Sequence, residues 1–176
     1  GDSSNTIIDG GGISSVIYMN PQTATIDTTT LIQGFKITNG GGVSNGGGLY
    51  VGNDVVINIK NSIVLNNTST ERGGGIFIIN DSQSGLYMTD CEVVNNATQH
   101  SGGGIALDYN GSESPFFHIS RTKFIGNNGL GESCQGAGIG ASRLGTSSIT
   151  NCYTLNIDIL DYIGCVKEED LMCRIT

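Results

Sequence analysis

The chain has 176 residues and a formal net charge of −8, and glycine is unusually frequent at 28 residues. This length fits one domain with its own hydrophobic core. The 8 Lys and Arg residues form no cluster and are outnumbered by 16 Asp and Glu residues, which argues against binding to nucleic acid or to an anionic membrane. No run approaches the roughly 18 apolar residues of a transmembrane helix, and we interpret a chain that begins at Gly1 as processed or cut from a longer one.

The first half of the chain contains two related segments, TIIDGGG (6–12) and LIQGFKITNGGG (31–42), in which apolar residues lead into glycine. Farther along, apolar residues alternate with others, as in VVINI (55–59) and FFHIS (116–120). Alternation is the period of a β-strand, and the Asn, Gly, Ser and Asp residues between such runs are typical of turns. We therefore predict short strands separated by turns, with helical spacing absent until the last ten residues.

The strands recur in four segments that can be aligned. These read IKNSIVLN (59–66), TDCEVVNN (89–96), SRTKFIGN (120–127) and ITNCYTLN (149–156). A strand-only repeat of about 30 residues is too short for a propeller blade and fits a solenoid in which each repeat forms one coil. The sequence thus predicts an all-β, single-stranded parallel β-helix of about five coils over residues 1–156.

Glycine clusters follow the first three of these segments, at 73–75, at 102–104 and in GAGI (136–139). A chain that leaves one sheet and enters another needs a corner, where a left-handed backbone costs a residue with a Cβ about 1 kcal/mol or more and costs glycine almost nothing. Glycine also lets neighbouring coils approach closely. The clusters therefore predict the corners of the coils.

These motifs resemble two groups of known proteins. The strings GGGL, GGGI and GAGI, together with FIGN, IVLN and VVNN, are similar to the GGA(I/L/V) and FxxN repeats of polymorphic outer membrane proteins. The segments TIIDGGG and LIQGFKITNGGG look like the first coils of the pectate-lyase-like parallel β-helix superfamily. The resemblance alone implies a right-handed coil, and it leaves the activity open because the superfamily includes lyases, glycosidases, adhesins and structural surface proteins.

The alignment also predicts which side chains stack on neighbouring coils. One predicted column contains the asparagines Asn66, Asn96, Asn127 and Asn156, whose amides would bond to turn backbone or to each other. Three further columns are predicted: Asn61 with Cys91 and Thr122, Lys60 with Asp90 and Arg121, and Glu92 with Lys123. We interpret all of these as structural ladders rather than as catalytic groups.

The resemblance to polysaccharide-cleaving β-helices implies segments that the chain lacks. The strings NTD, DD, GHG and RIK of polygalacturonase-type hydrolases do not occur, nor does the arginine motif of the lyases. His100 and His118 have no second histidine at metal-binding spacing, so we expect surface or packing roles for them. No catalytic, cofactor or metal residue is predicted.

The repeat breaks after Asn156, and residues 157–176 form a predicted cap or tail. The segment VKEEDLMCRI (166–175) fits a short amphipathic helix that covers the last coil, and the alternatives are a partner-binding or irregular tail. Four cysteines lie in the last part of the chain: Cys134, Cys152, Cys165 and Cys173. In an exported protein they can form two disulfides in any of three pairings, and Cys91 is predicted to be a buried thiol.

Five asparagines match the N-glycosylation pattern N-x-S/T: Asn66, Asn67, Asn80, Asn96 and Asn110. Such matches also arise by chance in a chain this rich in Asn, Ser and Thr. They are candidate glycosylation sites if the chain comes from a eukaryotic secretory pathway.

A strong scaffold pattern without a catalytic signature favours an extracellular or cell-surface β-helix with a structural or adhesive role. Its expected partners are further copies of itself, assembled end to end, and glycans of the cell surface or matrix. The alternative is a lyase or glycoside hydrolase that acts on acidic polysaccharide, or a glycan-binding module. The predicted solenoid end would expose strand edges, which can pair with another chain.

Overall fold

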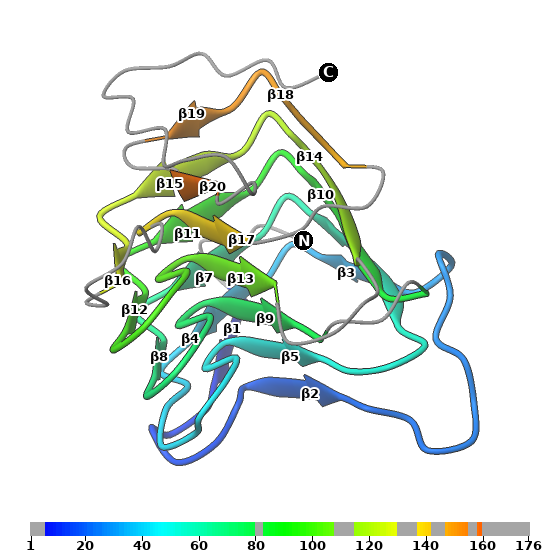
Figure 1. The fold of residues 1–176 in the computed structure, drawn as a ribbon, viewed down its shortest axis with the longest axis horizontal. Helices are drawn as coiled ribbons and strands as arrows, with labels where there is room; N and C mark the ends of the chain where they lie inside the picture. The colour runs from blue at the N-terminus through cyan, green and yellow to red at the C-terminus, as the bar shows by residue number, and fades with distance from the viewer. Residues whose placement is uncertain are drawn as a thin grey trace.

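The computed structural model describes residues 6–79, 83–107, 115–129, 137–141, 147–154 and 158–159. These residues form a parallel β-solenoid of about four turns, and they include no helix (Figure 1). The predicted all-β parallel solenoid is confirmed, with about four turns in place of about five. The C-terminal segment predicted as a helix, 166–175, lies outside the described residues.

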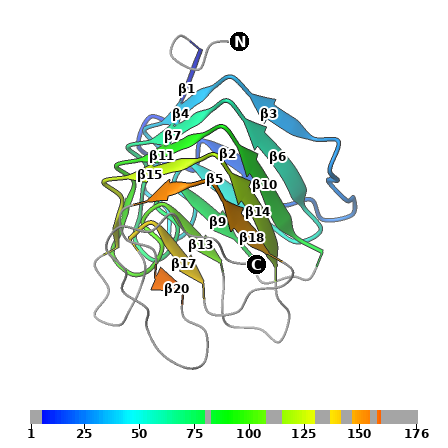
Figure 2. The same ribbon diagram turned by 90° about the horizontal axis from the view of Figure 1, so that it is seen from above.

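Four parallel sheets run along the solenoid, and each coil contributes one strand to each of its sheets (Figures 1 and 2). Sheet A contains β1 (Ile7–Asp9), β4 (Lys36–Thr38), β7 (Ile63–Leu65), β11 (Glu92–Val94), β15 (Lys123–Ile125) and β19 (Tyr153–Thr154). Sheet B contains β2 (Ile17–Met19), β5 (Leu49–Val51), β9 (Ile76–Ile78), β13 (Ile105–Leu107), β17 (Ile139–Ala141) and β20 (Asp158–Ile159). Sheet C contains β3 (Leu31–Gln33), β6 (Val56–Lys60), β10 (Gly85–Thr89), β14 (Phe116–Ser120) and β18 (Ser148–Thr150), and the small sheet D contains β8 (Thr68–Ser69), β12 (Ala97–Thr98) and β16 (Asn128–Gly129).

The core consists of columns of inward-facing side chains, one residue from each coil. Alternation along each strand sends every second side chain inward, which explains the apolar period that the sequence shows. In sheet A, for example, the register stacks Ile37, Val64, Val93 and Phe124, and each of these side chains is fully buried. The hydrophobic core is therefore continuous along the solenoid axis.

Glycines form the corner at which the middle coils enter sheet B. Gly73 has a φ of 62°, a left-handed conformation that glycine adopts at little cost. Its neighbour Gly74 is needed for a different reason, because a Cβ on it would overlap the carbonyl oxygen of Ala97 in the next coil. The predicted role of the glycine clusters as corners is thus confirmed.

The solenoid continues slightly beyond the predicted boundary at residue 156. β20 pairs in parallel with β17 through Gly140 with Asp158 and Ala141 with Ile159. Strand pairing therefore extends into the segment that the broken repeat had assigned to a cap or tail.

Candidate functional site

A ladder of buried asparagine side chains runs beneath the glycine corners. It consists of Asn67, Asn96 and Asn127, which are at most 8% exposed. The amide nitrogen of Asn67 donates to Oδ1 of Asn96 at 3.0 Å, and that of Asn96 donates to Oδ1 of Asn127 at 3.0 Å. The same Oδ1 atoms also accept from the backbone N–H groups of Asn67 and Asn96. The ladder thus satisfies buried polar groups in consecutive coils.

The predicted membership of this ladder was wrong by one residue at Asn66. The register pairs Val64 with Val93, an offset of 29 residues, so Asn67 rather than Asn66 aligns with Asn96. Asn66 is exposed and adopts a φ of 54° at the turn just before the ladder. Asn156 lies outside the described residues.

Burial of the ladder also bears on the candidate glycosylation sites. Asn67 and Asn96 are fully buried, and the amide nitrogen of each is a hydrogen-bond donor inside the solenoid. A glycan on either nitrogen would displace these hydrogen bonds, so the fold disfavours Asn67 and Asn96 as candidates. Asn66 is exposed, whereas Asn80 and Asn110 lie outside the described residues.

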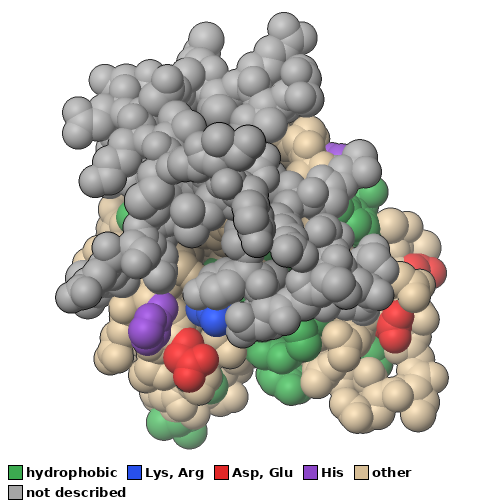
Figure 3. Space-filling model, viewed as in Figure 1, with side chains coloured by type: hydrophobic (Ala, Val, Ile, Leu, Met, Phe, Trp, Pro, Cys, Tyr) green, Lys and Arg blue, Asp and Glu red, His purple; other side chains and the backbone are tan. Residues whose placement is uncertain are grey.

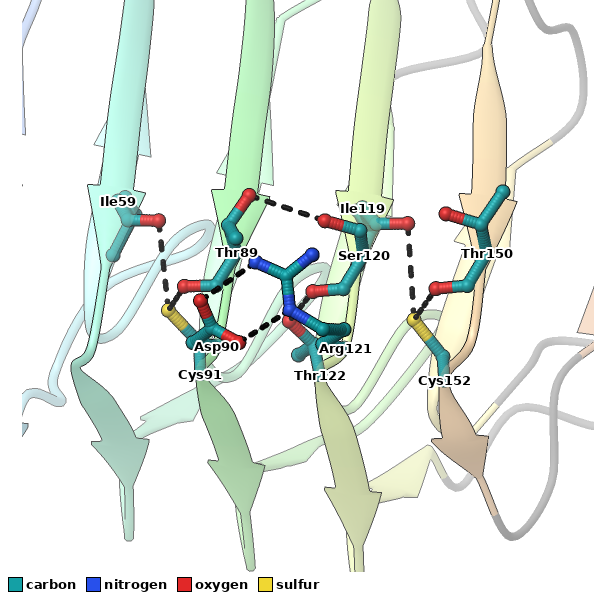
Figure 4. A network of polar contacts seen from close by, with 10 residues as sticks. All are labelled: Ile59, Thr89, Asp90, Cys91, Ile119, Ser120, Arg121, Thr122, Thr150 and Cys152. Atoms are coloured by element: carbon teal, nitrogen blue, oxygen red, sulfur yellow. Dashed lines mark hydrogen bonds and ion pairs between the residues drawn. The ribbon is translucent and has the colours of Figure 1, made fainter.

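An exposed row of side chains follows the corner between sheets C and A, and we call it the corner row. It contains Asn61, Asp90, Arg121 and Asn151, all exposed and all with a φ between 46° and 55°. Arg121 binds Asp90 through two contacts, Nε to Oδ1 at 2.6 Å and Nη2 to Oδ2 at 2.8 Å (Figure 4). The hydrogen bonds from Arg121 lower the pKa of Asp90, and the hydrogen bond from Asp90 raises the pKa of Arg121. Both groups therefore stay charged through the neutral pH range.

The register also corrects the predicted column of Lys60, Asp90 and Arg121. Lys60 pairs with Thr89, not with Asp90, so it lies beside the corner row rather than in it. Its charge still contributes to the lowered pKa of Asp90, after the hydrogen bonds from Arg121. The pairing of Glu92 with Lys123 is confirmed, with Nζ 2.8 Å from Oε1.

A buried column of hydroxyl and thiol side chains lies directly next to the corner row. It consists of Ser62, Cys91, Thr122 and Cys152, and Phe35 occupies the same column one coil earlier. Each of the four hydroxyl or thiol groups donates to the carbonyl oxygen two residues earlier in the chain, at 2.8, 3.2, 3.0 and 3.3 Å respectively. Figure 4 shows Cys91, Thr122 and Cys152 side by side on three successive coils. This column contains Ser62 where Asn61 was predicted, because the register offset is again one residue smaller than the alignment assumed.

Cys91 is a buried thiol, as predicted. Burial raises its pKa to about 11, so the sulfur is protonated and weakly nucleophilic at neutral pH. Cys152 is also buried, and its sulfur donates to the carbonyl oxygens of Ile119 and Thr150. No disulfide joins the described residues, and the predicted partners Cys134, Cys165 and Cys173 lie outside them.

A group of aromatic rings covers part of the outer face of sheet C. Tyr87 and His118 stack with centroids 5.1 Å apart, and Phe116 meets the edge of Tyr87 at 5.6 Å. The Nδ1 atom of His118 lies 2.8 Å from Oγ of Ser148 on the next coil. The rings are engaged with one another, so His118 has a packing role here.

The inward-facing side chains of the first coil, residues 6–34, are more exposed than those of the later coils. Its inward-facing side chains Ile8, Ile17, Met19, Ile26 and Ile32 are only partly buried, whereas their register partners Ile37, Leu49, Val51, Val55 and Ile59 are fully buried. Tyr18 on the outer face of β2 is 61% exposed, and one side of its ring stacks on Tyr50 at 4.7 Å. Hydrophobic side chains gather in Figure 3 over β2 and β5. The first coil thus exposes apolar surface at its end and on its outer face.

Two classes of site are missing from the part of the chain that the structure describes. No group of three or more His, Cys, Asp or Glu side chains could hold a metal ion there. Within the same residues, no helix has the length and apolar character needed to cross a membrane.

No protein-family model, curated protein or solved structure matches this chain. The fold is therefore established by its own strand register, and the family resemblance rests on the repeated motifs alone.

Proposed function

We propose that this protein is an extracellular or cell-surface β-helix with a structural or adhesive role. The observation that carries the proposal is the corner row, because contacts between coils fix its exposed polar side chains at the spacing of stacked strands, about 4.8 Å. Asp90 and Arg121 are held by their paired contacts, and the hydroxyls of Thr89 and Ser120 lie 3.2 Å apart beside them. A rigid, regularly spaced polar surface suits adhesion to a repeating polymer.

The expected targets of this surface are glycans of the cell surface or matrix. The corner row and its flank offer amides, hydroxyls and the exposed Lys60, which are groups that hydrogen-bond to sugar hydroxyls. Exposure of the candidate glycosylation residue Asn66 is compatible with secretion. We also propose, from the segments TIIDGGG (6–12) and LIQGFKITNGGG (31–42), kinship with the pectate-lyase-like right-handed β-helix superfamily.

The test is binding of the purified chain to three immobilised polymers: a uronic-acid polymer, a sulfated polysaccharide and a neutral polysaccharide. The double variant Lys60→Ser with Asn61→Gly alters the corner row at position 61 and its flank at position 60, and it keeps a residue suited to positive φ at position 61. We expect it to weaken binding at least about tenfold. Glu71→Ser, an exposed change at another corner, is the matched control and should bind as the parent does.

Two results would contradict the proposal. One is absence of binding to all three polymers and to cell-surface and matrix preparations. The other is release of products from the uronic-acid polymer, with or without Ca²⁺, which would favour the lyase or hydrolase alternative.

A further inference from the structure

The outer face of sheet A carries a column of apolar side chains. The central residues of β7, β11 and β15 are fully buried and point inward, so the residues on either side of them point outward. One outward column runs from Leu65 through Val94 to Ile125 on successive coils. Ile125 is 37% exposed, and the other two side chains are half-buried.

The outer face of sheet C has a different character. One of its outward columns consists of Lys60, Thr89 and Ser120 on the same coils. Polar side chains of this kind are expected where a sheet faces water. The apolar column of sheet A is instead a feature of surfaces that contact protein.

A charged pair lies beside the apolar column. The Nζ atom of Lys123 lies 2.8 Å from Oε1 of Glu92, and the two side chains are 55% and 39% exposed. The pair bridges β11 and β15, the strands that also carry Val94 and Ile125. Each of these strands thus presents one charged and one apolar side chain outward, and the sign of the charge reverses between them.

This pattern is complementary to its own copy. A two-fold axis that runs parallel to the strands, midway between β11 and β15, lays β11 of one copy over β15 of a second copy. Glu92 then faces Lys123 of the second copy, Val94 faces its Ile125, and the reverse contacts are identical. An axis midway between β7 and β11 would oppose Ile63 and Glu92, and an axis along the solenoid would oppose Glu92 and Val94. Both of these leave a desolvated charge without a partner.

We propose that the outer face of sheet A is a dimerisation surface on which a second copy of this chain docks, with β11 of each copy over β15 of the other. The charged and apolar columns form the centre of the contact. The exposed turn residues Asn66 and Asn95 lie beyond one end of the strands, and the corner row lies beyond the other. Polar rims around a more apolar centre are the usual anatomy of a protein interface. This inference goes beyond the adhesive role and does not depend on it.

The two-fold axis also determines where the corner rows lie in the dimer. Because the axis is parallel to the strands, the strand ends next to the corner row lie on the same side in both copies. The dimer would therefore present two corner rows side by side. A polymer bound by one row would be held close to the other, which raises the overall affinity without any new kind of contact.

The deciding experiment reverses the two charges in separate chains. Glu92→Lys places like charges at the contact, and so does Lys123→Glu. Each variant alone should have a dissociation constant at least about tenfold above that of the parent, measured by sedimentation over a range of concentrations. An equal mixture of the two variants should dimerise again, because every position 92 then faces a position 123 of opposite charge. Each chain lacks its internal ion pair both alone and in the mixture, so rescue by mixing reports contact between chains.

A matched pair of variants tests the apolar column. Ile125→Lys should raise the dissociation constant at least about tenfold, whereas Leu31→Lys, at an exposed apolar position on the outer face of sheet C, should leave it unchanged. A parent that is monomeric at every concentration overturns the proposal. So does a mixture of charge variants that stays dissociated, or association that persists in both charge variants alone.

The adhesive function and the dimer can fail separately. A monomeric parent that still binds glycan, cell-surface or matrix preparations would remove the dimer and keep adhesion. A dimer that is rescued by mixing, in a chain that binds none of these preparations, would remove adhesion and keep the dimer.

Discussion

The first coil and the middle coils contain the same kinds of residue in the same columns, yet their burial differs. Ile32 and Ile59 are register partners in sheet C. Ile59 is 0% exposed, because coils cover it on both sides, whereas Ile32 is only partly buried. Burial in a solenoid is therefore a property of neighbouring coils and not of the single repeat, as expected when each repeat contacts only its neighbours.

The polar columns differ between these regions in residue type as well. Middle coils place Asn67 and Asn96 in the ladder, while the register puts Gly40 in that column one coil earlier, where its N–H donates to Oδ1 of Asn67. Similarly, Phe35 occupies the column of Ser62 and Cys91 one coil before Ser62. Buried polar and titratable groups are thus concentrated in the middle coils, where effects on stability should be largest.

The largest effect is expected at the centre of the asparagine ladder. Asn96→Ala removes the donor to Val64 and Asn127 and the acceptor for Asn67, which leaves several buried groups unpaired. We expect the free energy of unfolding to fall by about 3–5 kcal/mol in urea titrations. Asn66→Gly is the control, since Gly126 already occupies the equivalent turn with a φ of 62°, and a similar loss in the control would contradict the ladder's role.

A direct test of the coil comparison is truncation of two residues in one column. Ile59→Ala should lower the free energy of unfolding by about 3 kcal/mol, as for other fully buried aliphatic side chains. Ile32→Ala should cost about half as much, because part of Ile32 is already in water. Urea unfolding measures both costs, and an equal cost at the two positions would contradict the comparison.

Alkaline pH should destabilise the middle coils through Cys91. Its pKa is raised from about 9 to about 11 in the folded state. The unfolded state therefore loses its thiol proton first, and stability that is fully present below pH 9 is lost as the pH rises through 11, by on the order of 2 kcal/mol. Cys91→Ser should lack this component of the loss, because Ser62 shows that a hydroxyl fits the same column. Equal pH profiles for the parent and the variant would contradict it.

The sequence predicted the strands and corners well because both depend on local patterns. Alternation gave the inward-facing residues such as Ile57 and Ile59, and glycine clusters gave the corners at Gly73 and Gly102. The ion pairs of Asp90 with Arg121 and of Glu92 with Lys123 also followed from spacing.

Register was harder to predict because the coils differ in length. The offset between coils is 29 residues from Val64 to Val93 and 31 from Val93 to Phe124. Aligning the four segments on their last asparagine therefore paired Asn66, instead of Asn67, with Asn96. Adjacent pairs held the missing signal: Asn66 and Asn67 align with Asn95 and Asn96, the first of each pair being at the turn with positive φ. The exposure of the first coil had no local signal, since it depends on what lies beside the coil.

The smallest effect on stability is expected at the corner row. In this column the first coil has Gly34, which carries no charge, whereas a middle coil has Asp90. Asp90 has a lowered pKa because of Arg121, so its stabilising contribution is present above the ordinary carboxyl pKa and is lost as the pH falls through its folded value. Asp90→Asn keeps a residue suited to positive φ, as Asn61 and Asn151 in the same row show, and it removes the charge. Thermal unfolding between pH 6 and pH 2 should therefore show a slightly steeper acid loss in the parent than in the variant. The side chains of Asp90 and Arg121 are both about half exposed, so high salt should abolish the difference between parent and variant. A difference that survives high salt would mean that a partner covering the corner row shields the pair from solvent.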